Sequence, residues 1–253
     1  KTAFLLCEFG KFIAATSPGW VVVENVPGIL NKKGSALPEF IELLESLKYQ
    51  FSHRLIDMSK FGIPQTRHRF VLIATRLACV PTLPDSLPHP VKTVREFLGI
   101  EKGFPIITAG HSDKSQFLHS SSGLSDLNLA RIKATPKNGG TRAAWAQRPE
   151  LSVATYEGRS RQFADVYSRM AWDKPAPTIT TRFNSYSNGR FGHPEEDRAI
   201  SLREGATLQT FPRSFRFFGS KPTIARHIGN AVPPQFAKRL GQHLLKLHRS
   251  TAI

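Results

Sequence analysis

Apolar residues near the start of the chain recur at helical spacing. Positions 5, 9, 12 and 13 lie on one face of a helix, so the pattern predicts an amphipathic helix that ends near Ser17–Gly19. Trp20–Val23 follows between two Pro-Gly pairs. A continuous apolar run of this kind is typical of a parallel strand covered on both faces, and we expect one here.

A second helix and two further strands follow at short intervals. Pro38 opens a segment with apolar residues on one side, which predicts a helix. Phe51–Asp57 and Phe70–Ala74 predict strands on either side of the turn-rich segment Lys60–Pro64. The order helix, strand, helix, strand, strand indicates an α/β fold.

The pattern changes beyond Cys79, where prolines occur in quick succession and sustained periodicity is lost. This region predicts a second, loop-rich domain. It contains Gly139–Arg142 and a basic, aromatic stretch from Arg159 to Arg190, with a short candidate strand at Pro177–Thr181.

Regular structure is expected again near the C-terminus. Ser201–Glu204 has the spacing of a capping box at a helix start, although Gly205 weakens such a helix by about 1 kcal/mol relative to Ala. A final helix is predicted from Pro233–Pro234 onward, and its apolar stripe needs a partner surface.

Composition adds a candidate partner. The chain has 253 residues, 40% of them hydrophobic, and a formal charge of +16 from 35 Lys and Arg against 19 Asp and Glu. This charge favours a polyanion such as nucleic acid through phosphate contacts. A basic surface without a polyanionic partner, or a ribosomal or membrane-surface protein, would show the same balance.

The number of cysteines and the hydropathy of the chain argue against a disulfide-rich, metal-binding or membrane protein. Cys7 and Cys79 cannot form a disulfide framework, and neither belongs to a Cys-x-x-Cys pair that would suggest a metal site. No apolar run approaches the roughly 20 residues that span a bilayer. We therefore expect no metal, no membrane partner and a reducing cytoplasm.

Four short motifs occur in one order along the chain. They are Glu24–Gly28, Gln65–Arg69, Arg203–Glu204 with Leu208–Pro212, and Gly229–Pro234. Each is a weak signal alone. Together, with a long variable insert between the second and the third, they resemble the later motifs of cytosine-C5 DNA methyltransferases over essentially the whole chain. Gly189–Pro194 and Asn128–Ile132 in the insert are also similar to stretches of bacterial members.

The resemblance implies a fold, a reaction and partners. The implied fold is the C-terminal half of a class I S-adenosylmethionine-dependent methyltransferase sheet, which is Rossmann-like, plus a loop-rich target-recognition domain. Residues 1–78 would form the later half of the catalytic domain, residues 79–225 the small domain with the recognition region, and residues 226–253 a segment and helix returning to the catalytic domain. S-adenosyl-L-methionine is the implied cofactor, and double-stranded DNA, lying between the domains, the implied partner.

The implied reaction is methylation of cytosine at C5 within a specific sequence, in the bacterial cytoplasm, protecting host DNA from a cognate restriction endonuclease. A tRNA cytosine is an alternative substrate, because flipped-base chemistry also works there. The sequence does not give the target, and the residues that read bases in the major groove are not identified.

Glu24 is the implied base-holding residue. In this family a cysteine thiolate adds to C6 so that C5 can take the methyl group, and a carboxyl group at N3 and the N4 amine stabilises the adduct. The end of a buried strand is where an α/β sheet presents its ligand site, and a site closed around a flipped base would raise the carboxyl pKa. The simpler interpretation is a solvated Glu before a Pro-Gly turn.

Arg67 and Arg69 alternate on the way into a predicted strand, so their side chains are expected on one face. There they could meet the base O2, a phosphate or Glu24. The resemblance places Arg69 at the cytosine, whereas an ordinary surface salt bridge is the simpler alternative. Gln65 is expected to hold the loop.

The last motif implies cofactor contacts. Asn230 precedes a helix start with free backbone N–H groups, and similar motifs complete the S-adenosylmethionine pocket. Ala231 and Val232 would contribute through backbone or packing; a plain helix-entry turn is the alternative. Arg203 and Glu204 are expected to be structural, because the capping box already occupies Glu204.

The family's early motifs are not found in this sequence, including the Gly-rich cofactor loop and the Pro-Cys-Gln loop that supplies the nucleophile. Cys7 and Cys79 are better interpreted as small buried hydrophobes than as activated thiolates. Three explanations stay open: a fragment, one subunit of a split enzyme that needs the missing N-terminal half or a complementary subunit, or a non-catalytic DNA-binding or regulatory relative. We also expect the isolated chain to be poorly soluble.

Overall fold

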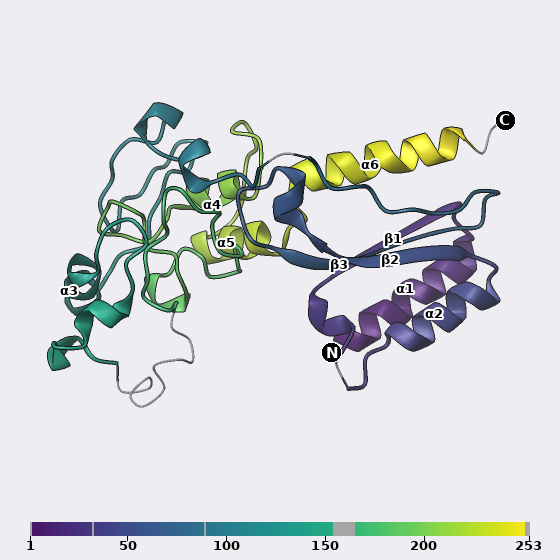
Figure 1. Cartoon of the computed structure of the whole chain (residues 1–253), viewed down its shortest axis with the longest axis horizontal. Coiled ribbons are helices and arrows are strands. Elements are labelled where there is room, and N and C mark those ends of the chain that lie inside the picture. Colours follow the sequence, from purple (N-terminus) through teal and green to yellow (C-terminus); the bar gives the residue numbers. More distant parts are fainter. Residues whose placement is uncertain (1, 32, 89, 154–164, 251–253) are drawn as a thin grey trace. The chain divides into compact units, whose positions relative to one another are not determined.

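The computed structural model describes residues 2–31, 33–88, 90–153 and 165–250, and it forms two compact units (Figure 1). Unit 1 contains residues 1–61, 68–88 and 236–253, and unit 2 contains residues 62–67 and 89–235. The basic, aromatic stretch from Arg159 to Arg190 that the sequence singles out begins outside the described residues. No described helix is both long enough and apolar enough to cross a bilayer.

Unit 1 has the alternation of helices and strands that the hydrophobic pattern predicts. Its elements are α1 (Thr2–Thr16), β1 (Trp20–Asn25), α2 (Leu37–Ser46), β2 (Gln50–Asp57), β3 (His68–Thr75) and α6 (Pro234–Arg249), with 3-10 turns at Pro27–Ile29 and Met58–Phe61. The predicted helices and strands of this region are therefore confirmed, and the mixed α/β class with them.

The three strands form one sheet in the order β1-β3-β2, with β3 antiparallel to both neighbours. Among the described residues, the predicted parallel pairing of β1 is wrong, and the second face of this strand is covered only in part. Its described partner runs antiparallel to it, and Val22 is 36% exposed between buried Val21 and Val23. An apolar run by itself sets neither the direction of pairing nor the cover on the second face.

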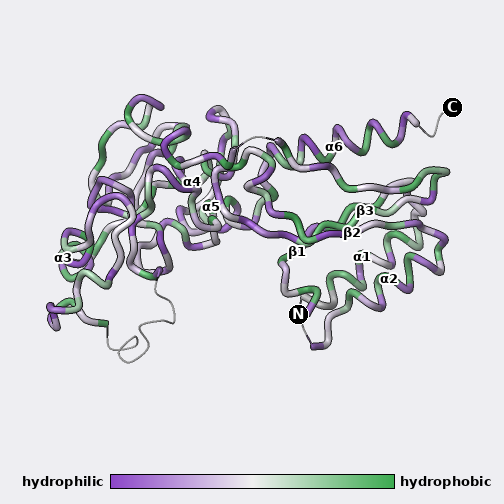
Figure 2. Tube along the Cα trace, viewed as in Figure 1, coloured by the Kyte–Doolittle hydropathy of each residue, from purple (hydrophilic) through white to green (hydrophobic). Residues whose placement is uncertain are grey.

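The two faces of the sheet are covered by different helices. Val21, Val23 and Phe70 join a core with residues of α1 and α2, which lie together along one face (Figure 1). On the other face, α6 packs through Phe236, which is fully buried with its ring 5.1 Å from that of Phe61. The apolar stripe of the last helix thus has a partner within unit 1, and Figure 2 shows hydrophobic and hydrophilic turns alternating along it.

Unit 2 contains mostly loops and short turns. Its helices are α3 (Asp126–Ala134), α4 (Leu202–Leu208) and α5 (Lys221–Asn230), with 3-10 turns at Val94–Glu96, Ile100–Lys102, Arg142–Trp145, Pro149–Leu151 and Tyr186–Asn188. The capping box at Ser201 is confirmed, because its hydroxyl accepts from the Glu204 amide and its own amide donates to the Glu204 carboxylate. Helices α3 and α5 were not predicted.

The candidate strand at Pro177–Thr181 is wrong. Residues 177–181 form no strand in the structure, and an isolated bridge between Gln65 and Ala176 lies directly before them. The Ile179 amide donates to the Gln65 side chain at 3.0 Å instead of to a neighbouring strand. A side chain thus satisfies a backbone donor that a strand ladder would otherwise use.

Candidate active site

Glu24 and Arg69 form an ion pair on the sheet of unit 1. Glu24 lies near the end of β1, opposite Val71 of β3, and Arg69 is two residues before Val71. Side chains at i and i+2 of a strand share a face, so the two residues are diagonal neighbours. The Arg69 Nε lies 3.0 Å from the Glu24 Oε1, which is the distance of a close ion pair.

The pair is only partly covered. The Glu24 side chain is 22% exposed and the Arg69 side chain 13% exposed. Burial lowers the pKa of the Arg69 guanidinium, and the Glu24 carboxylate opposes this effect. Arginine remains charged at neutral pH despite such a shift. The arrangement therefore presents a carboxylate, oriented by a fixed cation, to a ligand that can reach the sheet face.

The segment after Glu24 turns sharply away from the strand. The Asn25 side chain accepts from the Val26 amide at 2.8 Å, and a 3-10 turn over Pro27–Ile29 follows at once. Pro27 favours such a start because its ring presets φ. The turn ends β1 directly after Glu24–Asn25, which leaves the carboxylate at the end of the strand.

Arg67 has a different environment, although it lies only two residues from Arg69. Its side chain is 1% exposed. Its Nη1 donates to the Ile179 carbonyl at 3.0 Å, and its Nη2 donates to the carbonyls of Gly229 at 3.1 Å and Ala231 at 3.0 Å. The guanidinium thus joins three backbone carbonyls within unit 2.

Gln65 extends this buried network. Its amide nitrogen donates to the Leu208 carbonyl at 3.0 Å and to the Gln209 side chain at 2.8 Å. Gln209 in turn donates to the Ile228 carbonyl at 2.6 Å. Three of the motifs found in the sequence, Gln65–Arg69, Leu208–Pro212 and Gly229–Pro234, are therefore hydrogen-bonded to one another.

The turn after α5 is held closely against the rest of unit 2. A Cβ atom on Gly229 would lie 2.4 Å from the carbonyl carbon and oxygen of Thr180, so only glycine fits without a shift of backbone. Asn230 is exposed at this turn, and Ala231 and Val232 are half-buried. An exposed amide beside two small apolar side chains is a donor set that suits a polar organic ligand.

Glu204 belongs to a buried charge network. Its carboxylate accepts from Arg198 at 2.7 and 2.8 Å, and neither side chain is exposed. Burial alone would raise the pKa of Glu204, but the bonds from Arg198 outweigh it and hold the pKa at about 2. Arg198 also binds Glu196 at 2.9 Å. The expected structural role of Glu204 agrees with this environment.

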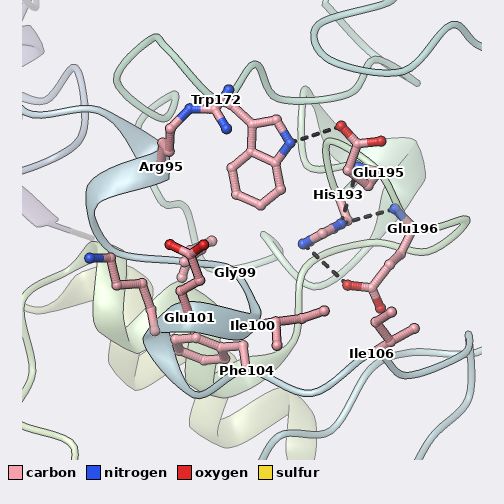
Figure 3. Close-up of a pocket in the computed structure, with 12 residues that line it drawn as sticks. Arg95, Gly99, Ile100, Glu101, Phe104, Ile106, Trp172, His193, Glu195 and Glu196 are labelled. Carbon is pink, nitrogen blue, oxygen red and sulfur yellow. Dashed lines mark hydrogen bonds and ion pairs between the residues drawn. The ribbon is translucent and has the colours of Figure 1, made fainter.

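His193 connects this network to a cavity of about 380 Å³ in unit 2 (Figure 3). Its Nδ1 accepts from the amides of Glu195 and Glu196 at 3.2 and 3.0 Å, so the proton of the neutral ring lies on Nε2. Burial lowers the pKa of His193, which keeps the ring neutral. Trp172 forms a wall of the cavity and donates to Glu195 at 2.9 Å.

Potential ligand atoms of His193, Glu196 and Glu204 lie within 4.8 Å of one another. However, Arg198 binds both carboxylates, and a guanidinium in that position repels a metal cation. The cluster is an ion-pair network around an arginine.

The environment of the two cysteines differs from the prediction. Cys7 is exposed on α1 and Cys79 is half-buried, so the interpretation of Cys7 as a small buried hydrophobe is wrong. The predicted apolar face of α1 is also wrong in part. Leu6 and Ile13 join the core of unit 1, whereas Leu5, Phe9 and Phe12 are 68%, 38% and 68% exposed, as is the side of the helix that carries Cys7. Neither cysteine lies within the contacts described above for Glu24 or Arg67.

Solved structures with a similar fold are methyltransferases. A DNA modification methyltransferase encoded within an E. coli prophage matches with a TM-score of 0.64 and 21% identity, over 95% of this chain and 73% of that one. The methyltransferase EhMeth of Entamoeba histolytica matches with a TM-score of 0.56 and 14% identity, over 90% and 63%. At these identities the likeness establishes the class I methyltransferase fold alone.

Sequence comparison defines the family. The model for C-5 cytosine-specific DNA methylases matches residues 1–246, and the chain belongs to this family. Members of this family use S-adenosyl-L-methionine as methyl donor. Type II methylase M.HgiDII of Herpetosiphon aurantiacus is 41% identical over 98% of this chain and 72% of its own length. Type II methyltransferase M.NgoFVII of Neisseria gonorrhoeae is 31% identical over 95% of this chain and 62% of its own.

Proposed function

We propose that this chain supplies the base-holding part of a cytosine-C5 DNA methyltransferase that acts on a specific double-stranded sequence within a restriction–modification system. The Glu24–Arg69 pair at the end of β1 carries this proposal, because it combines a carboxyl group with an orienting cation on a partly open sheet face. Family membership and the type II relatives support the class of reaction.

In this proposal the Glu24 carboxyl group binds N3 and the N4 amine of a cytosine turned out of the duplex. Such a contact stabilises the charge that develops on the ring when C6 is attacked. Arg69 holds the carboxyl group in position and offers its remaining N–H groups to the base O2. Arg67 acts as a positioning residue, because its N–H groups bind the backbone carbonyls of Gly229 and Ala231.

The exposed Asn230 side chain and the half-buried Ala231 and Val232 are the proposed contacts to S-adenosyl-L-methionine, which supplies the methyl group when bound. An amide and two small apolar side chains fit a molecule with both polar and apolar edges. The partly buried hydrogen bonds from Arg67 and Gln209 to the Ala231 carbonyl keep this turn in place.

The attacking thiolate is proposed to come from outside residues 1–253, from another segment of the same enzyme or from a complementary subunit. Cys7 is exposed on α1 and Cys79 is half-buried, and neither stands in the Pro-Cys-Gln context of the family's nucleophile. A cognate restriction endonuclease is the proposed functional partner.

A methyl-transfer assay tests the proposal. The chain, joined or mixed with the segment that bears the nucleophile, is incubated with labelled S-adenosyl-L-methionine and either duplex DNA or tRNA, and the product is digested and analysed by mass spectrometry. We expect 5-methylcytosine in the duplex at one sequence. Label in tRNA alone, or DNA binding without any transfer, would contradict the proposal and favour an RNA enzyme or a non-catalytic binding relative.

A further inference from the structure

The charge of the chain is unevenly distributed. Glu204 is the last acidic residue, and residues 205–253 contain eight Lys and Arg residues and no Asp or Glu. Four of these cations belong to unit 2, at Arg213, Arg216, Lys221 and Arg226. A segment whose charged side chains are all cationic contributes a positive potential that attracts anions.

The loop that carries the first two of these cations is firmly anchored. Arg203 is 1% exposed; its Nε donates to the Phe117 carbonyl at 2.5 Å and its Nη2 to the Phe215 carbonyl at 3.0 Å. Its guanidinium also lies 5.3 Å from the centre of the Phe217 ring. Arg213 donates to the Gly103 carbonyl at 2.9 Å. Both arginines therefore hold the loop in a fixed conformation.

Aromatic residues complete the anchoring. The rings of Phe211, Phe215 and Phe217 pack together with centroids 4.9 to 5.1 Å apart. Phe218 lies outside this cluster and is 79% exposed. Gly219 then turns the chain with φ +112° into α5, whose first residue is Lys221. A large apolar side chain is thus held in solvent by a rigid loop.

The neighbours of Phe218 indicate its partner. Arg216 is exposed and has no hydrogen-bond or ion-pair partner in the described part of the chain, and Lys221 lies three residues beyond Phe218. A protein partner that matched this surface would have to supply acidic groups around an apolar centre. Duplex DNA offers both features at regular spacing, since phosphates flank the sugars and base edges of each groove.

We propose that the segment Phe211–Lys221, here called the aromatic loop, binds double-stranded DNA: Arg216 and Lys221 contact backbone phosphates, and Phe218 packs against a sugar or base edge between them. The inference rests on the proposed function, which supplies the DNA substrate, and adds a contact surface distinct from the Glu24–Arg69 pair. Phosphate contacts add affinity without sequence preference, so this surface orients the protein on DNA and does not read bases.

Binding of fluorescent duplexes by this chain, joined or mixed with the segment that bears the nucleophile, tests the aromatic loop when anisotropy is measured over a range of salt concentrations. The variants are Arg216→Gln, Lys221→Gln and Phe218→Ala. Two control variants remove matched groups from elsewhere in unit 2: Lys133→Gln removes an exposed lysine of α3, and Ile106→Ala removes an apolar side chain that is 70% exposed.

Each charge variant should lower the slope of log affinity against log salt by about 0.9, because one fewer counterion is released. Phe218→Ala should weaken binding about fivefold or more with the slope unchanged, as expected for an apolar contact to nucleic acid. The controls should bind as the unmodified chain does, and circular dichroism should show all variants folded.

Binding by the unmodified chain that all three variants reproduce would overturn the aromatic loop as a DNA contact and leave the proposed function standing. Failure of the unmodified chain to bind any duplex would contradict both proposals. Equal losses in the variants and in the Lys133 and Ile106 controls would also overturn the inference, because the effect would then come from general surface charge and hydrophobicity.

Discussion

The chain contains two Glu–Arg pairs of the same chemistry in different environments. Glu24 and Arg69 in unit 1 are 22% and 13% exposed and share a contact at 3.0 Å. Glu204 and Arg198 in unit 2 are fully buried and share two contacts, and Glu204 also binds the Ser201 amide. The first carboxylate can still accept a ligand, whereas the second has its acceptor sites occupied.

The comparison separates a residue available for chemistry from one that maintains the fold. A fully buried pair is costly to break, because removal of one partner leaves an unpaired charge in a medium of low dielectric constant. A partly exposed pair contributes about 0 to 1 kcal/mol, because water replaces the lost contact. We therefore expect substitutions at Glu204 to change stability, and substitutions at Glu24 to change activity.

The largest expected effect is that of Glu204→Ala. It leaves the Arg198 charge buried without this partner, so unit 2 should lose about 3 to 5 kcal/mol of stability. Urea unfolding monitored by tryptophan fluorescence measures the change, since Trp145 and Trp172 both belong to unit 2. Glu24→Ala is the control and should cost about 1 kcal/mol or less. Equal losses from the two substitutions would remove the distinction between the pairs.

The pH dependence of stability sharpens the same comparison. The pKa of Glu204 is about 2 in the folded protein against 4.5 for the unperturbed group, so its contribution is present above pH 4.5 and is lost as the pH falls towards 2. The loss is on the order of 3 kcal/mol. Glu204→Gln should therefore flatten the decline in the urea midpoint across this window. If the urea midpoint of Glu204→Gln fell as steeply over this pH range as that of the unmodified chain, Glu204 would not be the group responsible for the loss of stability.

A smaller effect is expected at the turn after α5. Gly229→Ala places a Cβ 2.4 Å from the Thr180 carbonyl, and this overpacking should cost about 1 to 3 kcal/mol and weaken cofactor binding measured by calorimetry. Gly241→Ala is a matched control, because a Cβ there meets no atom within 4 Å. Within α6 the control should stabilise the chain by about 0.5 to 1 kcal/mol. Gly229→Ala without cost would mean that the turn is not tightly held.

Local patterns in the sequence predicted those features that depend on neighbouring residues. The strands of unit 1 and the capping box at Ser201 were predicted because alternation and helix caps act over a few positions. The direction of β1 was predicted wrongly, since pairing depends on β3, which lies much further along the chain. Helix α5 was missed because its start at Ser220 follows an aromatic loop without helical periodicity.

The candidate site shows the same limit. A family motif indicated Glu24 and Arg69, and the structure brings them together across two strands. The positions of Gln65 and Arg67 could not be predicted, because their partners lie 143 and 162 residues away in segments with no shared pattern. The burial of several arginines was not predicted either. The positive net charge suggested a surface that binds nucleic acid, but four of the cations are buried within unit 2: Arg67, Arg169, Arg198 and Arg203.

The central claim is that Glu24 acts on the cytosine and that the fold does not depend on it. The most direct test is the single-turnover rate of methyl transfer for Glu24→Gln at saturating duplex DNA, measured with the enzyme that contains this chain. Glutamine keeps the size of the side chain but removes its negative charge and the carboxyl proton. We expect a rate at least about a hundredfold lower, with DNA affinity and urea stability close to those of the unmodified enzyme. A rate equal to that of the unmodified enzyme would contradict the claim.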